Sequence, residues 1–317
     1  MLEVKNLKKC FTSNNNRRLW AVNGVSFQVK KNEALGIVGE SGCGKSTLAR
    51  LILRLIEPSA GQVFFEGREI TGISRKELRP VRRMMQMVFQ NPFASFNPKI
   101  RIWEALTEVC RYYGNSKAES NSKIDKLLND TGLSHDLLNR WPRELSGGQL
   151  QRLAIARALL SEPSLLAADE PLASLDVSVQ AQLLNLLDDI RKSRSMTMIF
   201  ISHDMNVVEY FCDRAAVMYM GVIMEIIRAP QLCNALHPYT KSLRASAPRL
   251  DVFKDTDRAE DDLLIPAIKG ETPAPRVQLS GCPFAPRCPE AKPQCAQAMP
   301  DLREVSEGHW VRCRSII

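Results

Sequence analysis

Apolar positions near the N-terminus follow strand-like patterns first and a helix-like pattern afterwards. The runs Leu2–Leu7 and Trp20–Val29 predict strands, and the polar stretch Ser13–Arg18 between them predicts a surface loop. Ala34–Val38 is a short continuous apolar run, which is typical of a strand buried on both faces, and a helical pattern covers Lys45–Ile56. A strand that leads into a helix through glycines predicts an α/β fold.

A helical pattern dominates the middle of the chain, from about residue 91 to residue 163, as in Ile102–Tyr113 and Ile124–Leu128. Strand-like runs then return around a helical segment at Val177–Arg191; they are Leu165–Ala168, Met196–Ile201 and Ala215–Tyr219. We therefore expect one parallel-sheet core that is split by a helical subdomain. The longest apolar runs, such as Ala215–Met224, fall short of the roughly 18 residues that a membrane-spanning helix needs, so we expect none.

The composition changes after residue 229. The segment 248–281 combines prolines with a cluster of acidic residues, which predicts an extended, solvated connection. These residues are Pro248, Pro266, Pro273 and Pro275, with Asp251, Asp255, Asp257, Glu260, Asp261 and Asp262. The connection leads to four closely grouped cysteines near the C-terminus.

The overall composition limits the class of protein. With 317 residues, 44% hydrophobic and 25% charged, the chain is an ordinary soluble one that is long enough for two compact units. Its first residues lack the apolar stretch of a secretory signal, so we expect a reducing cytosolic location where the nine cysteines are thiols or metal ligands. The net charge of +8 favours an anionic partner, such as nucleic acid, an anionic membrane surface or a nucleotide, but equally fits a solvated basic surface.

The strongest chemical signal is a glycine-rich loop between the predicted buried strand and the helix after it. The loop satisfies G-x-x-x-x-G-K-[ST] and consists of Gly39, Glu40, Ser41, Gly42, Cys43, Gly44, Lys45, Ser46 and Thr47. Its backbone N–H groups and the helix N-terminus suit phosphate oxygens. We expect Lys45 to reach the β and γ phosphates of a nucleotide, Ser46 to ligate Mg²⁺, and Cys43 to be a small spacer rather than a nucleophile.

Two carboxylates follow the apolar run Leu165–Ala168, at the carboxyl end of a predicted strand, where α/β sheets place their ligands. We expect Asp169 to hold Mg²⁺ through water and Glu170 to activate the attacking water as a general base. An acidic pair after an apolar strand is common, so this motif is weak evidence alone and strong evidence together with the phosphate-binding loop.

A second glycine-rich helix start precedes the helical pattern Leu150–Leu160. It consists of Ser146, Gly147, Gly148 and Gln149. Ser146 fits a helix N-cap, and the bare N-terminus with its free N–H donors also fits a second anion site. Both interpretations stay open on physical grounds. If two such chains face each other, a nucleotide can lie between the phosphate loop of one and the Ser-Gly-Gly helix of the other.

Six motifs in this order resemble those of the ATP-binding subunit of an ABC transporter. They are the Walker A loop at Gly39–Thr47, the Q-loop glutamine Gln90, the signature at Leu145–Gln149, Walker B at Leu165–Glu170, the D-loop with Asp176, and the switch histidine His203. At the D-loop the chain has Ala-Ser-Leu-Asp where the family usually has Ser-Ala-Leu-Asp.

This resemblance implies a P-loop NTPase: a RecA-like parallel sheet core, an N-terminal antiparallel β-subdomain, an inserted α-helical subdomain and a small cysteine-containing C-terminal extension. It places the ATPase domain at residues 1–228, with the core at 1–90 and 164–228 and the helical subdomain at 91–163, and the extension at 229–317.

The same resemblance implies roles for single residues. Gln90 completes the Mg²⁺ shell and senses a membrane subunit, and His203 contacts the γ-phosphate and holds Glu170 and the attacking water in line. An aromatic side chain of the N-terminal strands is expected to stack on the adenine; Phe11 is preferred, and Trp20 is the alternative.

The four grouped cysteines are Cys282, Cys288, Cys295 and Cys313. Four thiolates in a cytosolic tail suggest tetrahedral Zn²⁺ or an iron–sulfur cluster, whereas a reducing compartment disfavours disulfides. The spacing lacks the C-x₂₋₄-C pair that is usual for structural zinc. Unliganded thiols are a third possibility.

Three further stretches resemble the C-terminal extension of dipeptide and oligopeptide importer ATPases: His237–Thr240, Gly270–Pro275 and Gly281–Cys288. Phe89–Pro98 resembles the F-type subunit of that ATPase pair. In that family, matching cysteines are associated with a [4Fe–4S] cluster.

The resemblance implies an ATP-hydrolysing subunit for uptake of short peptides. Its partners would be a sister ATP-binding subunit in a heterodimer, two transmembrane permease subunits and an extracytoplasmic peptide-binding protein, with the chain peripheral at the cytoplasmic face of the inner (plasma) membrane. A nickel, glutathione or antimicrobial-peptide transporter is the alternative within the class. A soluble ABC ATPase of DNA repair or translation is the alternative outside it, although one signature and a short helical insertion argue against that class, so no nucleic acid is expected.

Overall fold

The computed structural model describes residues 1–12, 18–173, 175–246 and 280–316. These residues form two compact units: Met1–Val29 with Ala34–Thr71 and Phe200–Ile317, and Lys30–Glu33 with Gly72–Ile199. The predicted loop Ser13–Arg18 lies almost entirely outside the described residues. Residues 248–279 of the predicted acidic, proline-containing connection, which include the Gly270–Pro275 stretch, also lie outside them.

An antiparallel sheet forms the N-terminal part of the first unit, with the strand order β2-β1-β4-β5. Its strands are β1 (Leu2–Thr12), β2 (Arg18–Val29), β4 (Ala60–Phe65) and β5 (Arg68–Glu69). Apolar side chains such as Val4 and Val63 are buried, so one face of this sheet contributes to the core. The sequence patterns predicted β1 and β2 but not β4 and β5.

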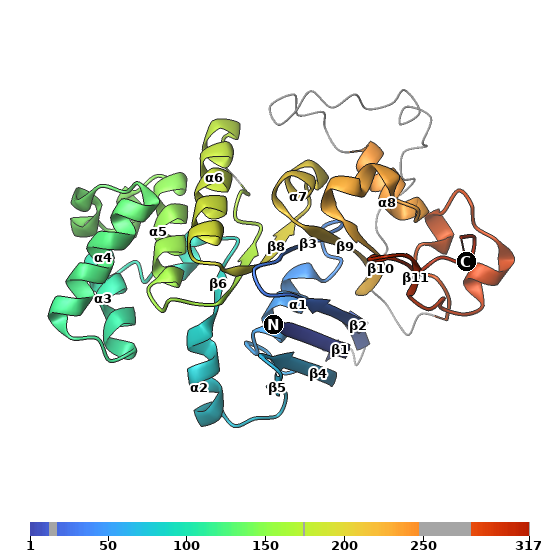
Figure 1. The fold of residues 1–317 in the computed structure, drawn as a ribbon, viewed down its shortest axis with the longest axis horizontal. Helices are drawn as coiled ribbons and strands as arrows, with labels where there is room; N and C mark the ends of the chain where they lie inside the picture. Colours follow the sequence, from blue (N-terminus) through green and yellow to red (C-terminus); the bar gives the residue numbers. More distant parts are fainter. Residues whose placement is uncertain (13–17, 174, 247–279, 317) are drawn as a thin grey trace. The chain divides into compact units, whose positions relative to one another are not determined.

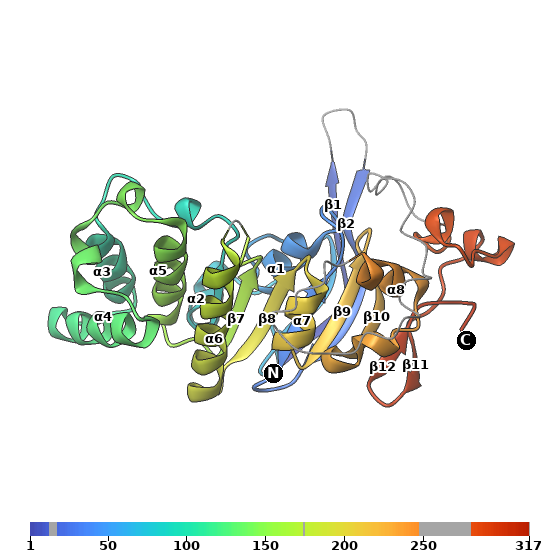
Figure 2. The ribbon, with the colours of Figure 1, turned by 90° about the horizontal axis from the view of Figure 1, so that it is seen from above.

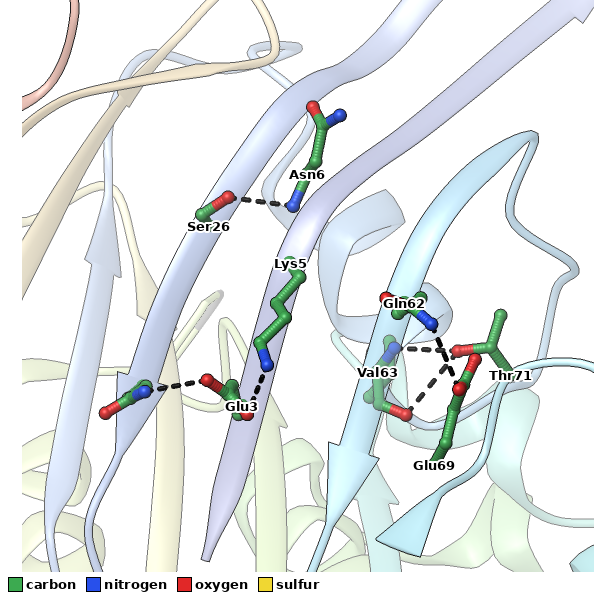
Figure 3. A network of polar contacts seen from close by, with 9 residues as sticks. Glu3, Lys5, Asn6, Ser26, Gln62, Val63, Glu69 and Thr71 are labelled. Carbon is green, nitrogen blue, oxygen red and sulfur yellow. Dashed lines mark hydrogen bonds and ion pairs between the residues drawn. The ribbon is translucent and has the colours of Figure 1, made fainter. Parts of the chain in front are cut away.

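Polar side chains follow the exposed side of this sheet, as Figure 3 shows. The pairing of β1 with β2 shifts register between Val4 and Leu7, where Asn6 has a φ of 46°. The Ser26 hydroxyl accepts a hydrogen bond of 2.8 Å from the Asn6 amide, so this backbone donor is paired despite the irregularity in the strand pairing.

Five strands of the second sheet lie wholly in the first unit, in the order β11-β12-β10-β9-β3. Its strands are β3 (Ala34–Val38), β9 (Arg214–Tyr219), β10 (Val222–Arg228), β11 (Arg303–Ser306) and β12 (His309–Val311). β3 is parallel to β9, and every residue of β3 is buried, as its continuous apolar run predicted. β10 pairs with β9 and β12 in antiparallel orientation, so the C-terminal strands extend the same sheet.

The helices of the first unit are α1 (Lys45–Ile52), α7 (Met205–Phe211) and α8 (Pro238–Ala245), with 3₁₀ turns η4 (Ala229–Asn234), η6 (Ala285–Arg287) and η7 (Pro293–Ala296). α7 contacts β3 and α8 contacts β10, as can be followed in Figure 2. α1 is shorter than predicted: Arg54 adopts a left-handed φ of 52° just after the helix and ends it.

The second unit combines parallel strands with most of the longer helices. Strand β6 (Met85–Val88) is parallel to β7 (Leu165–Asp169), and β8 (Thr197–Ser202) begins in this unit. Its helices are α2 (Arg75–Met84), α3 (Ile102–Tyr112), α4 (Lys117–Thr131), α5 (Gly147–Leu159) and α6 (Val177–Ser193), with η1 (Pro92–Ser95), η2 (His135–Asn139) and η3 (Pro142–Glu144).

Helices α3, α4 and α5 pack together, as Figure 1 shows. Leu128 of α4 and Leu153 of α5 are fully buried among them. The helical character predicted for residues 91–163 is therefore confirmed. No helix in the described ranges is long and apolar enough to cross a membrane.

The last turn of helix α1 and the turn after it supply a stability test, because Leu51 in the helix is buried whereas Leu55 after it is exposed. Leu51 has no exposed surface, whereas Leu55 is 43% exposed. We predict that Leu51→Ala lowers the free energy of unfolding by about 2–5 kcal/mol, because it leaves a cavity, and that Leu55→Ala lowers it by less than about 1 kcal/mol. Urea unfolding followed by circular dichroism measures both values; equal losses would contradict this assignment of the core.

Candidate functional site

The phosphate-binding loop lies in the first unit, between β3 and α1. Two of its glycines are required by close approach to neighbouring strands. A Cβ atom on Gly39 would lie 2.1 Å from the Met218 carbonyl oxygen, and one on Gly44 would lie 2.0 Å from the Ala21 carbonyl oxygen. Gly44 also has a left-handed φ of 105°. The loop backbone is thus pressed against β9 and β2, and no residue with a side chain fits at these two positions.

Lys45 is buried within its own loop. Its ammonium group donates hydrogen bonds to the carbonyl oxygens of Gly39, at 2.7 Å, and Glu40, at 3.0 Å. Gly44, the N-cap of α1, supplies no side-chain hydrogen bond to the helix start. This arrangement provides a cation and a helix N-terminus beside one backbone loop, which is the arrangement that phosphate binding requires.

Cys43 lies buried within the phosphate-binding loop. This burial raises the pKa of its thiol. Because only the thiolate is a good nucleophile, this cysteine is poorly suited to covalent chemistry.

In the second unit, the structure brings two of the predicted residues together. Gln90 donates a hydrogen bond of 2.9 Å from Nε2 to the Glu170 carboxylate. Glu170 follows β7 with a left-handed φ of 45°, and Asp169 is buried at the end of the same strand. Glu170, which is proposed to activate water, and Asp169, which is one of the proposed Mg²⁺ ligands, are therefore adjacent, and Gln90 orients the Glu170 carboxylate.

The Ser-Gly-Gly helix start is a capping box. The Ser146 hydroxyl accepts a hydrogen bond of 3.3 Å from the Gln149 amide, and the Gln149 side chain accepts one of 3.1 Å from the Ser146 amide. The capping interpretation is confirmed. Gly148 lies against α6, where an added Cβ would meet the Val179 side chain at 3.0 Å.

Asp176 is an exposed residue at the start of α6, and its side chain makes no capping hydrogen bond there. The neighbouring serine of the D-loop lies outside the described residues. His203 follows β8 and is exposed.

The two candidates for adenine stacking lie on paired strands of the first unit. Phe11 on β1 is 41% exposed, and Lys9 places its ammonium 5.1 Å from the centre of the Phe11 ring. Trp20 is only half-buried and pairs with Cys10 on the same strand. Both rings are accessible, so the choice between them stays a prediction.

The four grouped cysteines line one cavity of about 20 Å³ in the first unit. Burial raises the pKa of the thiols of Cys282, Cys288 and Cys313, that of Cys288 to about 11. Within the described part of the chain, however, no three His, Cys, Asp or Glu side chains are arranged to hold a metal ion. The four thiols lie together, as their grouping in the sequence predicted, but these described residues are not arranged to bind a metal ion.

The C-terminal extension contacts the phosphate-binding loop, and no sequence motif predicted this contact. The Tyr239 hydroxyl, at the start of α8, accepts a hydrogen bond of 3.0 Å from the Glu40 amide, across 199 residues of sequence. His237 caps α8 by accepting a hydrogen bond of 3.0 Å from the Tyr239 amide at Nδ1. Burial lowers the pKa of His237 to about 4, so the ring is neutral at pH 7 and can accept.

Arg287 makes a second such contact. Its guanidinium donates a hydrogen bond of 2.8 Å to the Glu40 carboxylate and one of 3.1 Å to the Tyr219 hydroxyl. In the sequence, only the stretches that resemble an importer extension indicated that Tyr239 and Arg287 lie in a distinct region. Those stretches did not indicate which residues this region contacts.

Comparisons with known proteins identify the family of this chain. The family described as "ABC transporter" matches residues 22–173, and the family described as "Oligopeptide/dipeptide transporter, C-terminal region" matches residues 224–295. YkfD of Bacillus subtilis (strain 168) is 44% identical over 99% of this chain and 94% of its own length. The "Oligopeptide transport ATP-binding protein AppF" of the same strain is 42% identical over 99% of this chain and 96% of its own.

Among solved structures, this chain is similar to the ATP-binding cassette MJ0796, which was solved as a dimer in a post-hydrolysis state with ADP and Pi. The match covers 72% of this chain and 99% of that chain, with a TM-score of 0.67 and 28% sequence identity. The fold is therefore that of an ABC cassette. The motifs, the full-length relatives and this fold together show that the chain belongs to the ABC transporter family, with the oligopeptide/dipeptide transporter C-terminal region as its extension.

Proposed function

We propose that this chain binds and hydrolyses ATP as a subunit of a membrane importer for dipeptides or oligopeptides. The hydrogen bond between Gln90 and Glu170 is the observation that supports hydrolysis most directly, because it orients the carboxylate that would act as the base. The match of residues 224–295 to a peptide-transporter region, and the printed name of AppF, support the peptide substrate.

Each residue of the ATP site has a role in this proposal. Residues Gly39–Thr47 bind the phosphates, and Lys45 moves its hydrogen bonds from loop carbonyls to phosphate oxygens. Glu170 takes a proton from the attacking water, while His203 contacts the γ-phosphate and keeps this water in line.

Mg²⁺ would be held by Ser46, Gln90 and Asp169. The oxygen donors of these side chains are the type that Mg²⁺ prefers, and Asp169 lies at the carboxyl end of β7, where α/β sheets place their ligands, so the residues fit this ion. When bound, it would neutralise developing charge on the phosphates.

A sister ATP-binding subunit would complete the site. Ser146, Gly147, Gly148 and Gln149 would contact the ATP held by the partner, and Asp176 would lie at the dimer contact. In this proposal the heterodimer is attached to two permease subunits at the cytoplasmic face of the membrane and receives peptide from an extracytoplasmic binding protein. Phe11, with Trp20 as the alternative, would stack on the adenine.

Substrate-stimulated ATP hydrolysis distinguishes peptides from the alternative transported substrates. The complete transporter in proteoliposomes should hydrolyse ATP faster when its binding protein carries a dipeptide or oligopeptide. Stimulation by nickel, glutathione or an antimicrobial peptide instead would identify the alternative transporters. Co-purification with ribosomes or DNA rather than with membrane subunits would overturn the transporter assignment.

For the cysteines, we propose that Cys282, Cys288, Cys295 and Cys313 are the ligand set of a [4Fe–4S] cluster, with Zn²⁺ as the alternative. The shared cavity supports this choice of residues, but their present arrangement does not fit a metal, so the side chains would have to close around it, and no catalytic step involves the cluster.

Metal analysis tests the cysteine ligand set. Protein purified without oxygen should contain iron and sulfide and should absorb visible light, and Cys288→Ser should reduce both contents, whereas the exposed Cys233→Ser should not. A colourless protein with one zinc and no iron or sulfide would reject the iron–sulfur cluster, and one with neither metal would reject both.

Loss of the loop lysine should impair nucleotide binding. We predict that Lys45→Ala raises the dissociation constant for MgATP by roughly 10- to 100-fold, because hydrogen bonds to charged groups contribute about 1.5–3 kcal/mol. The exposed Lys31→Ala is the matched control. Equilibrium binding of a fluorescent ATP analogue measures both; an unchanged affinity in Lys45→Ala would show that the loop does not bind the phosphates.

Removal of the base should separate binding from turnover. We predict that Glu170→Gln leaves ATP affinity intact, traps a nucleotide-bound dimer and lowers the hydrolysis rate by about 10²- to 10⁴-fold. Glu162→Gln, whose carboxylate contacts only Lys123 among the ion pairs described, is the control. Phosphate release and size-exclusion chromatography provide the two readouts, and hydrolysis at the wild-type rate would exclude Glu170 as the base.

A further inference from the structure

Glu40, the second residue of the phosphate-binding loop, is held at three of its polar groups. Its amide donates to the Tyr239 hydroxyl at 3.0 Å, its carboxylate accepts from Arg287 at 2.8 Å, and its carbonyl accepts from Lys45 at 3.0 Å. Two of these three contacts come from outside the loop, and both come from the C-terminal extension.

The two contacting residues belong to the region that marks the peptide-transporter family, not to the cassette. Tyr239 and Arg287 fall within residues 224–295, which match the transporter C-terminal region, whereas the cassette match ends at residue 173. Arg287 is the last residue of η6 and immediately precedes Cys288. The Arg287 side chain therefore joins the cysteine-bearing segment to the phosphate-binding loop.

An aromatic cluster fixes these side chains in place. The rings of Tyr219 and Tyr239 are 4.7 Å apart, and Phe284 lies 5.5 Å from the first and 5.2 Å from the second. All three side chains are fully buried. Because such packing leaves few rotamers, the Tyr239 hydroxyl is held in position before nucleotide arrives. Arg287 is tied to the same cluster by its hydrogen bond to the Tyr219 hydroxyl.

The charge pair also has an electrostatic consequence for nucleotide binding. The side chains of Glu40 and Arg287 are only 17% and 9% exposed, so solvent screens them weakly. A negative Glu40 within a loop that accepts phosphates would repel them. Arg287 neutralises this charge. It also holds Glu40 in place, and the Glu40 carbonyl oxygen accepts a hydrogen bond from the Lys45 ammonium.

We propose that the C-terminal extension positions the phosphate-binding loop for ATP, through the contacts of Arg287 and Tyr239 with Glu40. Both are positioning residues, because they act on the nucleotide through Glu40 and the Lys45 ammonium. The proposal rests on ATP binding by the loop, but not on peptide transport or on a metal at the cysteines.

Nucleotide binding to the purified full chain tests the electrostatic part. Arg287→Met should weaken MgATP binding roughly tenfold, because the Glu40 carboxylate is left without its counter-charge near the phosphates. Arg287→Lys, which keeps the charge, should lose less than about threefold. Arg303→Met, an exposed arginine of the same extension that pairs with Asp301, is the control and should bind like the wild type.

A double variant separates repulsion from loss of folding. Glu40→Gln combined with Arg287→Met removes both charges and should recover most of the affinity that Arg287→Met lost. Tyr239→Phe keeps the ring and removes only the hydroxyl, and it should also weaken binding.

Two results would overturn the proposal: wild-type affinity in both Arg287→Met and Tyr239→Phe, or a folded double variant that binds as weakly as Arg287→Met. Binding by the wild type and by Arg303→Met in the same assay establishes the ATP site itself. An absence of ATP binding to the wild type would reject the proposed function, whereas wild-type affinity in the variants would reject only the positioning role.

Discussion

The close approach of the phosphate-binding loop to two strands is the constraint on which the site depends. Gly39 lies against the backbone of β9 and Gly44 against the backbone of β2, where added Cβ atoms would come within 2.1 Å and 2.0 Å of carbonyl oxygens. This contact fixes where α1 begins. It also places Lys45 under its own loop, where the ammonium bonds to two carbonyl groups that ATP phosphates would replace as acceptors.

The described parts of the C-terminal extension pack within the first unit and extend its sheet. Strand β12 pairs with β10, so the last residues continue the sheet that contains β9. The Glu225 carboxylate on β10 is fully buried, yet it accepts hydrogen bonds from the amides of Leu236 and His237 and contacts His309 at 2.7 Å. These partners compensate the cost of burying a charge, and they hold both described parts of the extension on one strand.

Much of the fold could be predicted from apolar patterns, and the errors have physical causes. The run Ala34–Val38 matched β3 at both ends, because a strand buried on both faces must be apolar throughout. Strand β10 was missed because the run Ala215–Met224 hides a turn, in which Met220 and Gly221 have φ values of 44° and 79°. Side-chain polarity does not reveal such a turn when both strands are buried.

The site was predictable where its residues are local in sequence, as in the loop Gly39–Thr47 or the pair Asp169 and Glu170. The hydrogen bond from Gln90 to Glu170 was consistent with the motif roles but not specified by them. The contact of Tyr239 with Glu40 was not predictable, because tertiary packing across 199 residues creates it and no spacing rule records it. The shared cavity of the four cysteines agreed with their grouping, whereas the arrangement needed for a metal did not follow from it.

Amide hydrogen exchange of the nucleotide-free chain tests most directly whether the extension holds the loop. Removing the Tyr239 hydroxyl by Tyr239→Phe should increase exchange across the loop peptide Gly39–Thr47 by about tenfold, while β4 exchanges as in the wild type, because local opening becomes easier only where a restraint is lost. Unchanged exchange throughout the loop in this variant would contradict the account and would leave the extension as a neighbour of the ATP site without an effect on it.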